Sequence, residues 1–204
     1  MKYLINKPNL SSLEKKYVNQ ALDTTWLSSN GVNTKIFQKK FSNYIGNKFS
    51  LAVQSGTSAL HLALKSLNVT SNDYVIIPNF TCVSNISAAS QCNAKIILVD
   101  VERETLGMDF LILKEILKKY RPKVLQLVHV YGFPAKDTLK IIKICKKKKI
   151  KVIEDTSESL GATINGKKVG TFGDINVTSI RSEKMIGVGE GAVISTNNKS
   201  LSDK

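Results

Sequence analysis

The sequence predicts an α/β domain with a mostly parallel sheet that helices cover on both faces. From residue 48 onward, short apolar runs alternate with amphipathic segments of helical period. This alternation is typical of successive βαβ units, whose strands are buried on both sides. The chain has 204 residues, of which 42% are hydrophobic. That length and composition suffice for one domain with a sizeable core.

Two helices are expected before the alternation begins. The first opens with Ser11 and Glu14, which have the spacing of a capping box. The second ends at Gly46, because glycine commonly follows the last turn of a helix. A polar loop with the only tryptophan joins them. We therefore expect an N-terminal helical segment, residues 1–47, followed by a larger domain, residues 48–204.

The larger domain is expected to contain strands and helices in strict alternation, then two final strands and a polar tail. Each strand is a short apolar run, and each helix carries apolar residues three or four positions apart. The expected strands are residues 48–53, 73–78, 94–100, 123–130, 150–156, 175–180 and 191–196, and the expected helices are residues 57–67, 81–92, 109–120 and 136–148.

Composition argues against several classes of protein. No apolar run approaches the roughly 20 residues that cross a bilayer. The first residues also lack the long apolar stretch of a signal peptide. Cys82, Cys92 and Cys145 form no CxxC pair. We therefore expect a protein of the reducing cytoplasm without structural disulfides or a metal site.

The net charge of +14 raises the possibility of a basic module that binds nucleic acid. However, only three of the 30 basic residues are arginines, and no aromatic residues are interleaved with them. Nucleic-acid-binding surfaces favour arginine and aromatic platforms. The charge therefore favours a hydrated, lysine-rich surface. Tight, salt-sensitive binding of DNA or RNA without cofactor uptake would instead favour the nucleic-acid alternative.

Residues that follow the strands are the candidate functional residues, because ligands of open α/β sheets bind beyond the carboxyl ends of the strands. Gly56 and Thr57 follow the first strand and open a helix, so their N–H groups could bind a phosphate. Serine or threonine at such a place is more often only a helix cap. His129 ends the fourth strand, where histidine is more often packed or hydrogen-bonded than catalytic.

An acidic pair and a lysine complete the set. Glu154 and Asp155 end the fifth strand, where a partly desolvated carboxylate needs a cationic partner. That partner could be a nearby lysine or a protonated cofactor ring. Lys184 follows the sixth strand on a glycine-containing loop, where a lysine near a buried site can act as a nucleophile. A phosphate-binding turn, a carboxylate and a lysine are the groups that pyridoxal 5'-phosphate needs.

Several longer segments carry a family resemblance. They are WLSSNG, SGTSALHLAL, DVERETLGMD, VHVYGFPAKD, IEDTSESLGATINGKKVGTFGDI and SIRSEKMIGVGEGAVIST, in this order. In these segments the chain resembles the sugar aminotransferases of the DegT/DnrJ/EryC1/StrS family. The resemblance implies the large domain of a PLP-transferase, that is, the aspartate aminotransferase-like fold.

The resemblance also implies residue roles. Lys184 would form a Schiff base with the cofactor and later move a proton between the substrate and cofactor carbons. Asp155 would bind the pyridinium N–H, and Glu158 matches a Gln-or-Glu position beside the phenolic oxygen. Gly56 and Thr57 would bind the phosphate.

Further cofactor and substrate contacts follow from the same resemblance. Ser179 would add its hydroxyl to the phosphate site, and the loop 26–31 would border the sugar-nucleotide site. Cys82 stands where many members carry the aromatic residue that stacks on the cofactor ring. Cysteine gives a thinner contact, and Phe80 could compensate.

The implied reaction transfers an amino group from an amino acid, with glutamate expected, to a keto carbon of a nucleotide-linked deoxysugar. Surface polysaccharide or O-antigen synthesis would use such a product. A PLP- or PMP-dependent sugar dehydratase of the same family is the alternative, but histidine replaces the lysine there, so Lys184 favours transamination. A dinucleotide-binding enzyme fits less well, because GVGEG precedes a strand and opens no helix.

Family members continue into a smaller C-terminal domain and work as homodimers. This chain stops soon after the lysine loop. We therefore expect it to be truncated before that domain, as a shortened reading frame, half of a split gene or a fragment. Apolar surface meant for the domain and the partner would be exposed. The 204 residues alone are expected to be poorly soluble or inactive.

Overall fold

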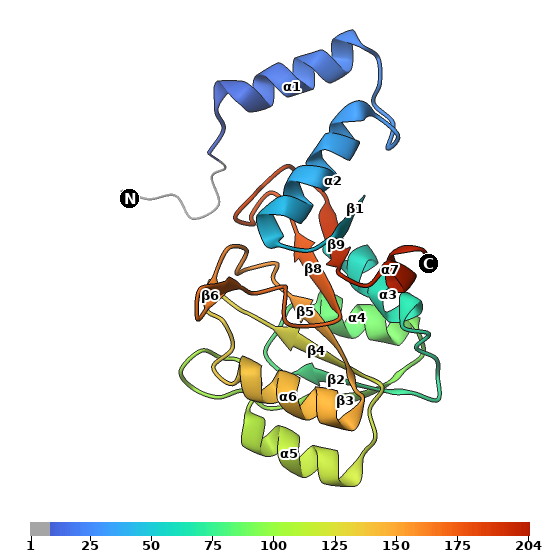
Figure 1. Ribbon diagram of the computed structural model, residues 1–204, viewed down its shortest axis with the longest axis vertical. Coiled ribbons are helices and arrows are strands. Elements are labelled where there is room, and N and C mark those ends of the chain that lie inside the picture. The colour runs from blue at the N-terminus through green and yellow to red at the C-terminus, as the bar shows by residue number, and fades with distance from the viewer. Residues whose placement is uncertain (1–8) are drawn as a thin grey trace.

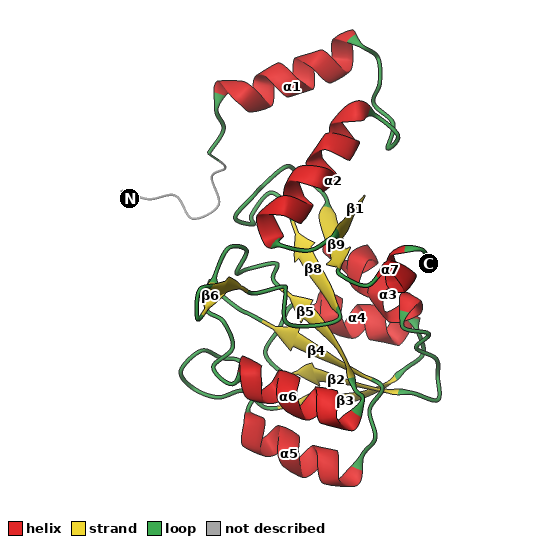
Figure 2. Cartoon of the chain, viewed as in Figure 1, coloured by secondary structure: helices red, strands yellow, loops and turns green. Residues whose placement is uncertain are grey.

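The computed structural model describes residues 9–204. Residues 1–8 lie outside the described residues. Two predictions fall partly on them: the N-terminal helical segment, residues 1–47, and the absence of a signal peptide. A seven-stranded sheet with helices on both faces forms the body of the described chain (Figures 1 and 2). The predicted α/β class, with a mostly parallel sheet, is confirmed.

The elements follow the predicted order and differ from it mainly at their ends. The helices are α1 (Ser12–Asp23), α2 (Val32–Ile45), α3 (Gly56–Ser66), α4 (Val83–Gln91), α5 (Phe110–Lys119), α6 (Thr138–Lys148) and α7 (Lys199–Ser202). The strands are β1 (Phe49–Val53), β2 (Tyr74–Pro78), β3 (Lys95–Val99), β4 (Val124–Val128), β5 (Lys151–Asp155), β6 (Thr163–Ile164), β7 (Lys167–Lys168), β8 (Ile175–Ser179) and β9 (Ala192–Thr196).

The strand order in the large sheet is β1-β9-β8-β5-β4-β2-β3. Strand β9 runs antiparallel to both of its neighbours, β1 and β8. The remaining pairs in the sheet are parallel. The carboxyl ends of β1, β8, β5 and β4 therefore lie along the same edge of the sheet, so the residues that follow them can meet.

The core has two main layers, one on each face of the sheet. Strand β2 contributes to both, because successive side chains of a strand point to opposite faces. Val75 and Ile77 pack in the layer under α3 and α4, whereas Ile76 packs in the layer under α5 and α6. This double burial explains why the strand is apolar throughout.

The N-terminal helices form as their ends predict. Ser11 and Glu14 make the capping box of α1. Helix α2 ends at Gly46, whose φ of 94° suits glycine. Ile45 of α2 packs in a small cluster with Val193 of β9, which anchors α2 to the sheet. Helix α1 has no buried residue, and Figure 1 shows it standing away from the sheet.

Two small elements differ from the prediction. Strands β6 and β7 form a hairpin within the segment expected to be irregular. Its turn is Asn165-Gly166, with φ values of 51° and 76°, and such a turn matches the twist of a hairpin. The expected polar tail contains the short helix α7, capped by Asn198, whose Oδ1 accepts from the N–H of Ser200 at 2.9 Å. Within residues 9–204, the helices are too short or too polar for any to cross a bilayer.

Candidate functional site

A cavity of about 230 Å³ lies beyond the carboxyl ends of β1, β4, β5 and β8. Side chains from segments far apart in the sequence line it, as the parallel arrangement requires. Every residue expected to act on a cofactor is among them. They are Gly56, Thr57, Cys82, Asp155, Glu158, Ser179 and Lys184.

Asp155 ends β5 and is held by two donors. The side-chain amide of Asn85 donates to Oδ2 at 2.9 Å, and the N–H of Ser157 donates to Oδ1 at 3.0 Å. Only 5% of the residue is exposed. Two donors on different oxygens fix the plane of the carboxylate. Each oxygen keeps a lone pair, so the group can still accept a further hydrogen bond.

Glu154 is fully buried and has partners of its own. The main-chain N–H groups of Gly170, Phe172 and Gly173 donate to its carboxylate at 2.7–2.8 Å. His129 contacts it at 3.2 Å. Burial by itself would raise the pKa of Glu154, but the hydrogen bonds from His129 and from the main chain lower it below its ordinary value. Neither a lysine nor a cofactor is needed to balance this carboxylate.

His129 is packed and hydrogen-bonded, as its place in the sequence favours. Its Nδ1 accepts from the N–H of Ala135 at 2.9 Å, so the ring proton lies on Nε2 and points to Glu154. The residue has no exposed surface. The ring joins β4 to β5 and to the loop that follows β4.

Lys184 lies on the loop between β8 and β9. Its Nζ donates to Oε1 of Glu158 at 3.0 Å, and 16% of the lysine side chain is exposed. The loop closes tightly, since the main-chain N–H of Ser182 donates to the carbonyl oxygen of Gly189 at 2.8 Å. A Cβ on Gly187 would come within 2.3 Å of the Ser182 carbonyl oxygen. Glycine at position 187 is therefore needed for the turn that carries the lysine into the cavity.

The N-terminus of α3 forms another wall. Ser55 is the N-cap, and its hydroxyl accepts from the N–H of Ser58 at 3.2 Å. The N–H groups of Gly56 and Thr57 have no acceptor within the helix. A Cβ on Gly56 would come within 3.2 Å of the Ser179 Cβ, so glycine allows β8 to approach closely. The cap uses neither of these two N–H groups, so both are left for an acceptor from outside the helix.

Three expected contacts have different outcomes. Cys82 lines the cavity, with Sγ 3.3 Å from Oγ of Ser84. Phe80 lies outside the lining and meets Tyr131 edge-on, with ring centroids 6.1 Å apart. The loop 26–31 also lies outside the lining. The stacking residue and the substrate role of that loop therefore stay predictions.

Sequence reasoning missed two features of the site. Arg181 and Glu190 both line the cavity, and Nε of Arg181 donates to Oε1 of Glu190 at 3.0 Å across the mouth of the Lys184 loop. Asn85 supports Asp155 from α4. A signal existed for each: Arg181 is one of three arginines, and Asn85 is an amide within an apolar helix face.

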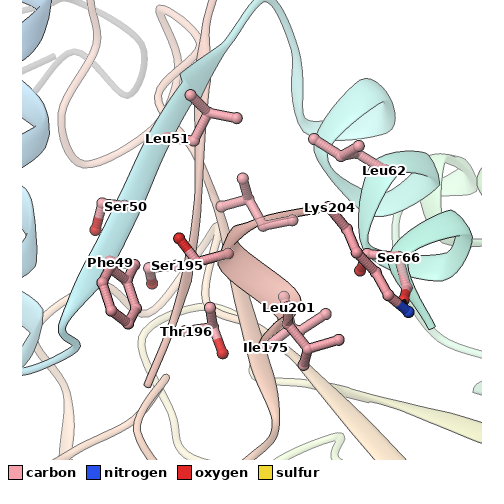
Figure 3. Close-up of a pocket in the computed structure, with 12 residues that line it drawn as sticks. Phe49, Ser50, Leu51, Leu62, Ser66, Ile175, Ser195, Thr196, Leu201 and Lys204 are labelled. Atoms are coloured by element: carbon pink, nitrogen blue, oxygen red, sulfur yellow. Dashed lines mark hydrogen bonds between the residues drawn. The ribbon is translucent and has the colours of Figure 1, made fainter. Parts of the chain in front are cut away.

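A second cavity, of about 170 Å³, lies at the opposite end of the sheet, between β1, β9, α3 and α7 (Figure 3). Its lining is apolar or hydroxyl-bearing apart from Lys204. That lysine donates to the carbonyl oxygen of Ser66 at 2.8 Å. This cavity therefore offers none of the acid, base or nucleophile groups that the first one brings together.

Comparison with known proteins agrees with this geometry. Residues 8–204 match the DegT/DnrJ/EryC1/StrS aminotransferase family. The chain belongs to this family. Its fold is that of the large domain of the PLP-transferases, as solved structures of the family also show.

Two relatives align with this sequence over all or nearly all of its length. A GDP-perosamine synthase of Escherichia coli O157:H7 is 38% identical over 100% of this chain and 56% of its own length. The GDP-perosamine synthase of Vibrio cholerae is 36% identical over 98% of this chain and 54% of its own length. The chain thus spans about half the length of these relatives.

Solved structures of other proteins superimpose closely on this chain. An E. coli GDP-4-keto-6-deoxy-D-mannose-3-dehydratase with bound hydrated PLP has a TM-score of 0.90 and 28% identity, over 98% of this chain and 52% of its own. An aminotransferase from Psychrobacter cryohalolentis has a TM-score of 0.88 and 27% identity, over 96% of this chain and 49% of its own.

Proposed function

We propose that the protein is a PLP-dependent aminotransferase that transfers an amino group from glutamate to a keto carbon of a nucleotide-linked deoxysugar. The observation that carries the proposal is the meeting of Lys184, Asp155 and the α3 N-terminus in one cavity. Bound PLP supplies an electron sink that stabilises negative charge on the substrate carbon. The relatives named GDP-perosamine synthase support the substrate class.

The α3 N-terminus fits the phosphate of the cofactor. Gly56 and Thr57 offer two free N–H groups, and the positive end of the helix dipole favours an anion there. Ser179 lies against Gly56 and lines the same cavity, so its hydroxyl can add a donor. These residues bind and orient the cofactor but take no part in proton transfer.

Asp155 fits the ring nitrogen. Its carboxylate is nearly buried, fixed by two donors and faces the cavity. An ionised carboxylate within hydrogen-bonding distance favours a protonated ring nitrogen. Asp155 therefore holds a proton at that nitrogen and orients the ring toward Lys184.

Lys184 would be the residue that condenses with the cofactor aldehyde, with release of water, and that would afterwards move the proton. Its Nζ contacts Glu158 at 3.0 Å, and a carboxylate at this distance can accept a proton from the ammonium group. Glu158 thus holds Lys184 beside the ring and can return a proton to it. Its own position is steadied by the N–H of Tyr131, which donates to Oε2 at 3.3 Å.

Sugar dehydration is the second candidate reaction, because a dehydratase lies among the structural relatives. Lys184 favours transamination.

We also propose that the working enzyme is a homodimer in the cytoplasm and contributes to O-antigen or another surface polysaccharide. The high positive charge of the chain suits a diphosphate-bearing substrate.

The test is cofactor uptake followed by product analysis. Purified protein incubated with PLP should show a visible band that borohydride bleaches, and peptide mass mapping should place the reduced cofactor on Lys184. Lys184→Ala should remove the band, whereas Lys118→Ala, an exposed lysine on α5, should keep it. A band that survives in Lys184→Ala would refute the assignment. With glutamate and GDP-4-keto-6-deoxymannose, an amino sugar supports transamination and a deoxygenated sugar supports dehydration.

A further inference from the structure

Asn85 is a buried polar side chain in direct contact with Asp155. It lies on α4 and has no exposed surface. Its Nδ2 donates to Oδ2 of Asp155 at 2.9 Å and to Oγ1 of Thr81 at 3.0 Å, so both amide hydrogens are used. Its Oδ1 has no partner among the described residues.

Such an arrangement is costly unless it serves another group. A buried polar atom without a partner destabilises the folded state, because it has lost its hydrogen bonds to water. On the neighbouring turn of α4, Ala88 and Ala89 pack in the apolar core. An apolar side chain at position 85 would avoid the unpartnered oxygen. The amide nitrogen, and the carboxylate that it contacts, therefore explain the asparagine better than packing does.

An amide is suited to hold a carboxylate in its charged form. It donates a hydrogen bond but does not give up the proton, so its contact favours the ionised acid over the protonated one. With Ser157 on the other oxygen, the amide also fixes the direction of the free lone pairs of Asp155. Asp155 and Lys184 line the same cavity.

We propose that Asn85 is a positioning residue that holds the Asp155 carboxylate in place for the ring nitrogen of the cofactor. This inference rests on the proposed function. It makes a specific claim about the nitrogen atom: the contribution of Asn85 to cofactor affinity passes through the Asp155 contact and vanishes when the ring has no nitrogen at that place.

The test compares PLP with 1-deaza-PLP, in which a C–H group replaces the ring nitrogen. The wild-type protein should prefer PLP, so the Kd for 1-deaza-PLP divided by the Kd for PLP should exceed one. In Asn85→Leu this ratio should be about tenfold or more smaller, since the lost hydrogen bond is to a charged group. Asn85→Ala serves if leucine is not accommodated. Thermal unfolding verifies that each variant is folded.

Gln126 provides a matched control. It is also fully buried with an unpartnered Oε1, and its Nε2 contacts the main-chain oxygen of Asn85 at 3.3 Å but not Asp155. Gln126→Met should keep the preference for PLP. An equal weakening of both ligands in Asn85→Leu, or the same loss of preference in Gln126→Met, would overturn the inference. A wild-type protein that binds neither ligand would instead refute the proposed function.

Discussion

At the residue scale, the acidic pair that ends β5 shows how neighbours in sequence divide their work. The carboxylate of Glu154 is hydrogen-bonded to main-chain N–H groups and to His129, whereas Asp155 lines the cavity. The sequence alone left the partners of both open. It predicted which residues approach the site, because strand ends meet. It did not predict the contacts of Asn85 or Arg181, which depend on side-chain directions that no spacing encodes.

Glu154 should make the fold sensitive to acid. Glu154→Gln leaves main-chain donors facing an amide, so we expect a loss of about 3 kcal/mol in the free energy of unfolding at pH 7. Because its pKa is lowered in the folded state, the stabilisation is present above the ordinary value of 4.5 and is lost as the pH falls through the lowered value. Urea unfolding at several pH values measures this.

Two results would support the role of Glu154. The difference between wild type and Glu154→Gln should shrink on acidification below pH 4.5. Glu115→Gln, at an exposed carboxylate on α5, should change stability much less than Glu154→Gln does. A constant difference down to strongly acidic pH would contradict the prediction.

The cysteines should differ sharply in reactivity. Burial raises the pKa of Cys145 to about 12, and burial also raises that of Cys92. At pH 8 only about one Cys145 in ten thousand is then a thiolate. Cys82 is exposed and lines the cavity, so it alone should react quickly with a thiol reagent, and bound PLP should slow it. Cys82→Ser should abolish the fast phase; rapid labelling of Cys145 in folded protein would disprove this.

At the element scale, most of the fold could be read from periodicity. The helices and strands from residue 11 to residue 196 form near the expected places because their apolar patterns agree with their burial. The Asn165-Gly166 hairpin was missed although its turn signal is present in the sequence. The place of β9 could not be predicted, since its pairing with β1 joins residues 49–53 to residues 192–196 and depends on packing across the whole sheet.

Helix α6 should gain stability from a change at its C-terminal end. Lys149 has a φ of 59°, in the left-handed region that favours glycine. We expect Lys149→Gly to raise the free energy of unfolding by about 0.5 to 1 kcal/mol. Lys147→Gly removes the same charge inside the last turn and should lower it by a similar amount. Equal effects of both substitutions on urea unfolding would contradict the left-handed geometry.

At the scale of the whole molecule, α1 presents an apolar stripe that nothing in the described structure covers. Leu13, Tyr17, Val18 and Leu22 recur at helical spacing and are all exposed. Single exposed apolar residues are common, but a contiguous stripe of them favours association. The body of the chain is well packed, so this surface matters for solubility more than for folding.

Through this exposed stripe, the 204 residues by themselves should associate. We expect light scattering after size-exclusion chromatography to show oligomers or aggregates. The double substitution Leu13→Glu with Val18→Glu should shift the protein toward monomer. Asn19→Glu with Gln20→Glu adds the same charge at polar positions of α1 and should shift it less. A monodisperse, monomeric wild-type chain would disprove the prediction.

The position of β9 has a consequence for synthesis on the ribosome. Within the sheet of residues 9–204, β1 neighbours β9 alone, yet β9 leaves the exit tunnel after every other strand of this sheet. In the nascent chain, β1 therefore stays unpaired until β9 has been synthesised. Contacts between segments that are distant in sequence also form slowly. The N-terminus of α3 and the loop that bears Lys184 line one cavity, and they are joined only when translation has nearly passed this region. Until then, chaperones would encounter an incomplete sheet in which β1 has no hydrogen-bonded neighbour.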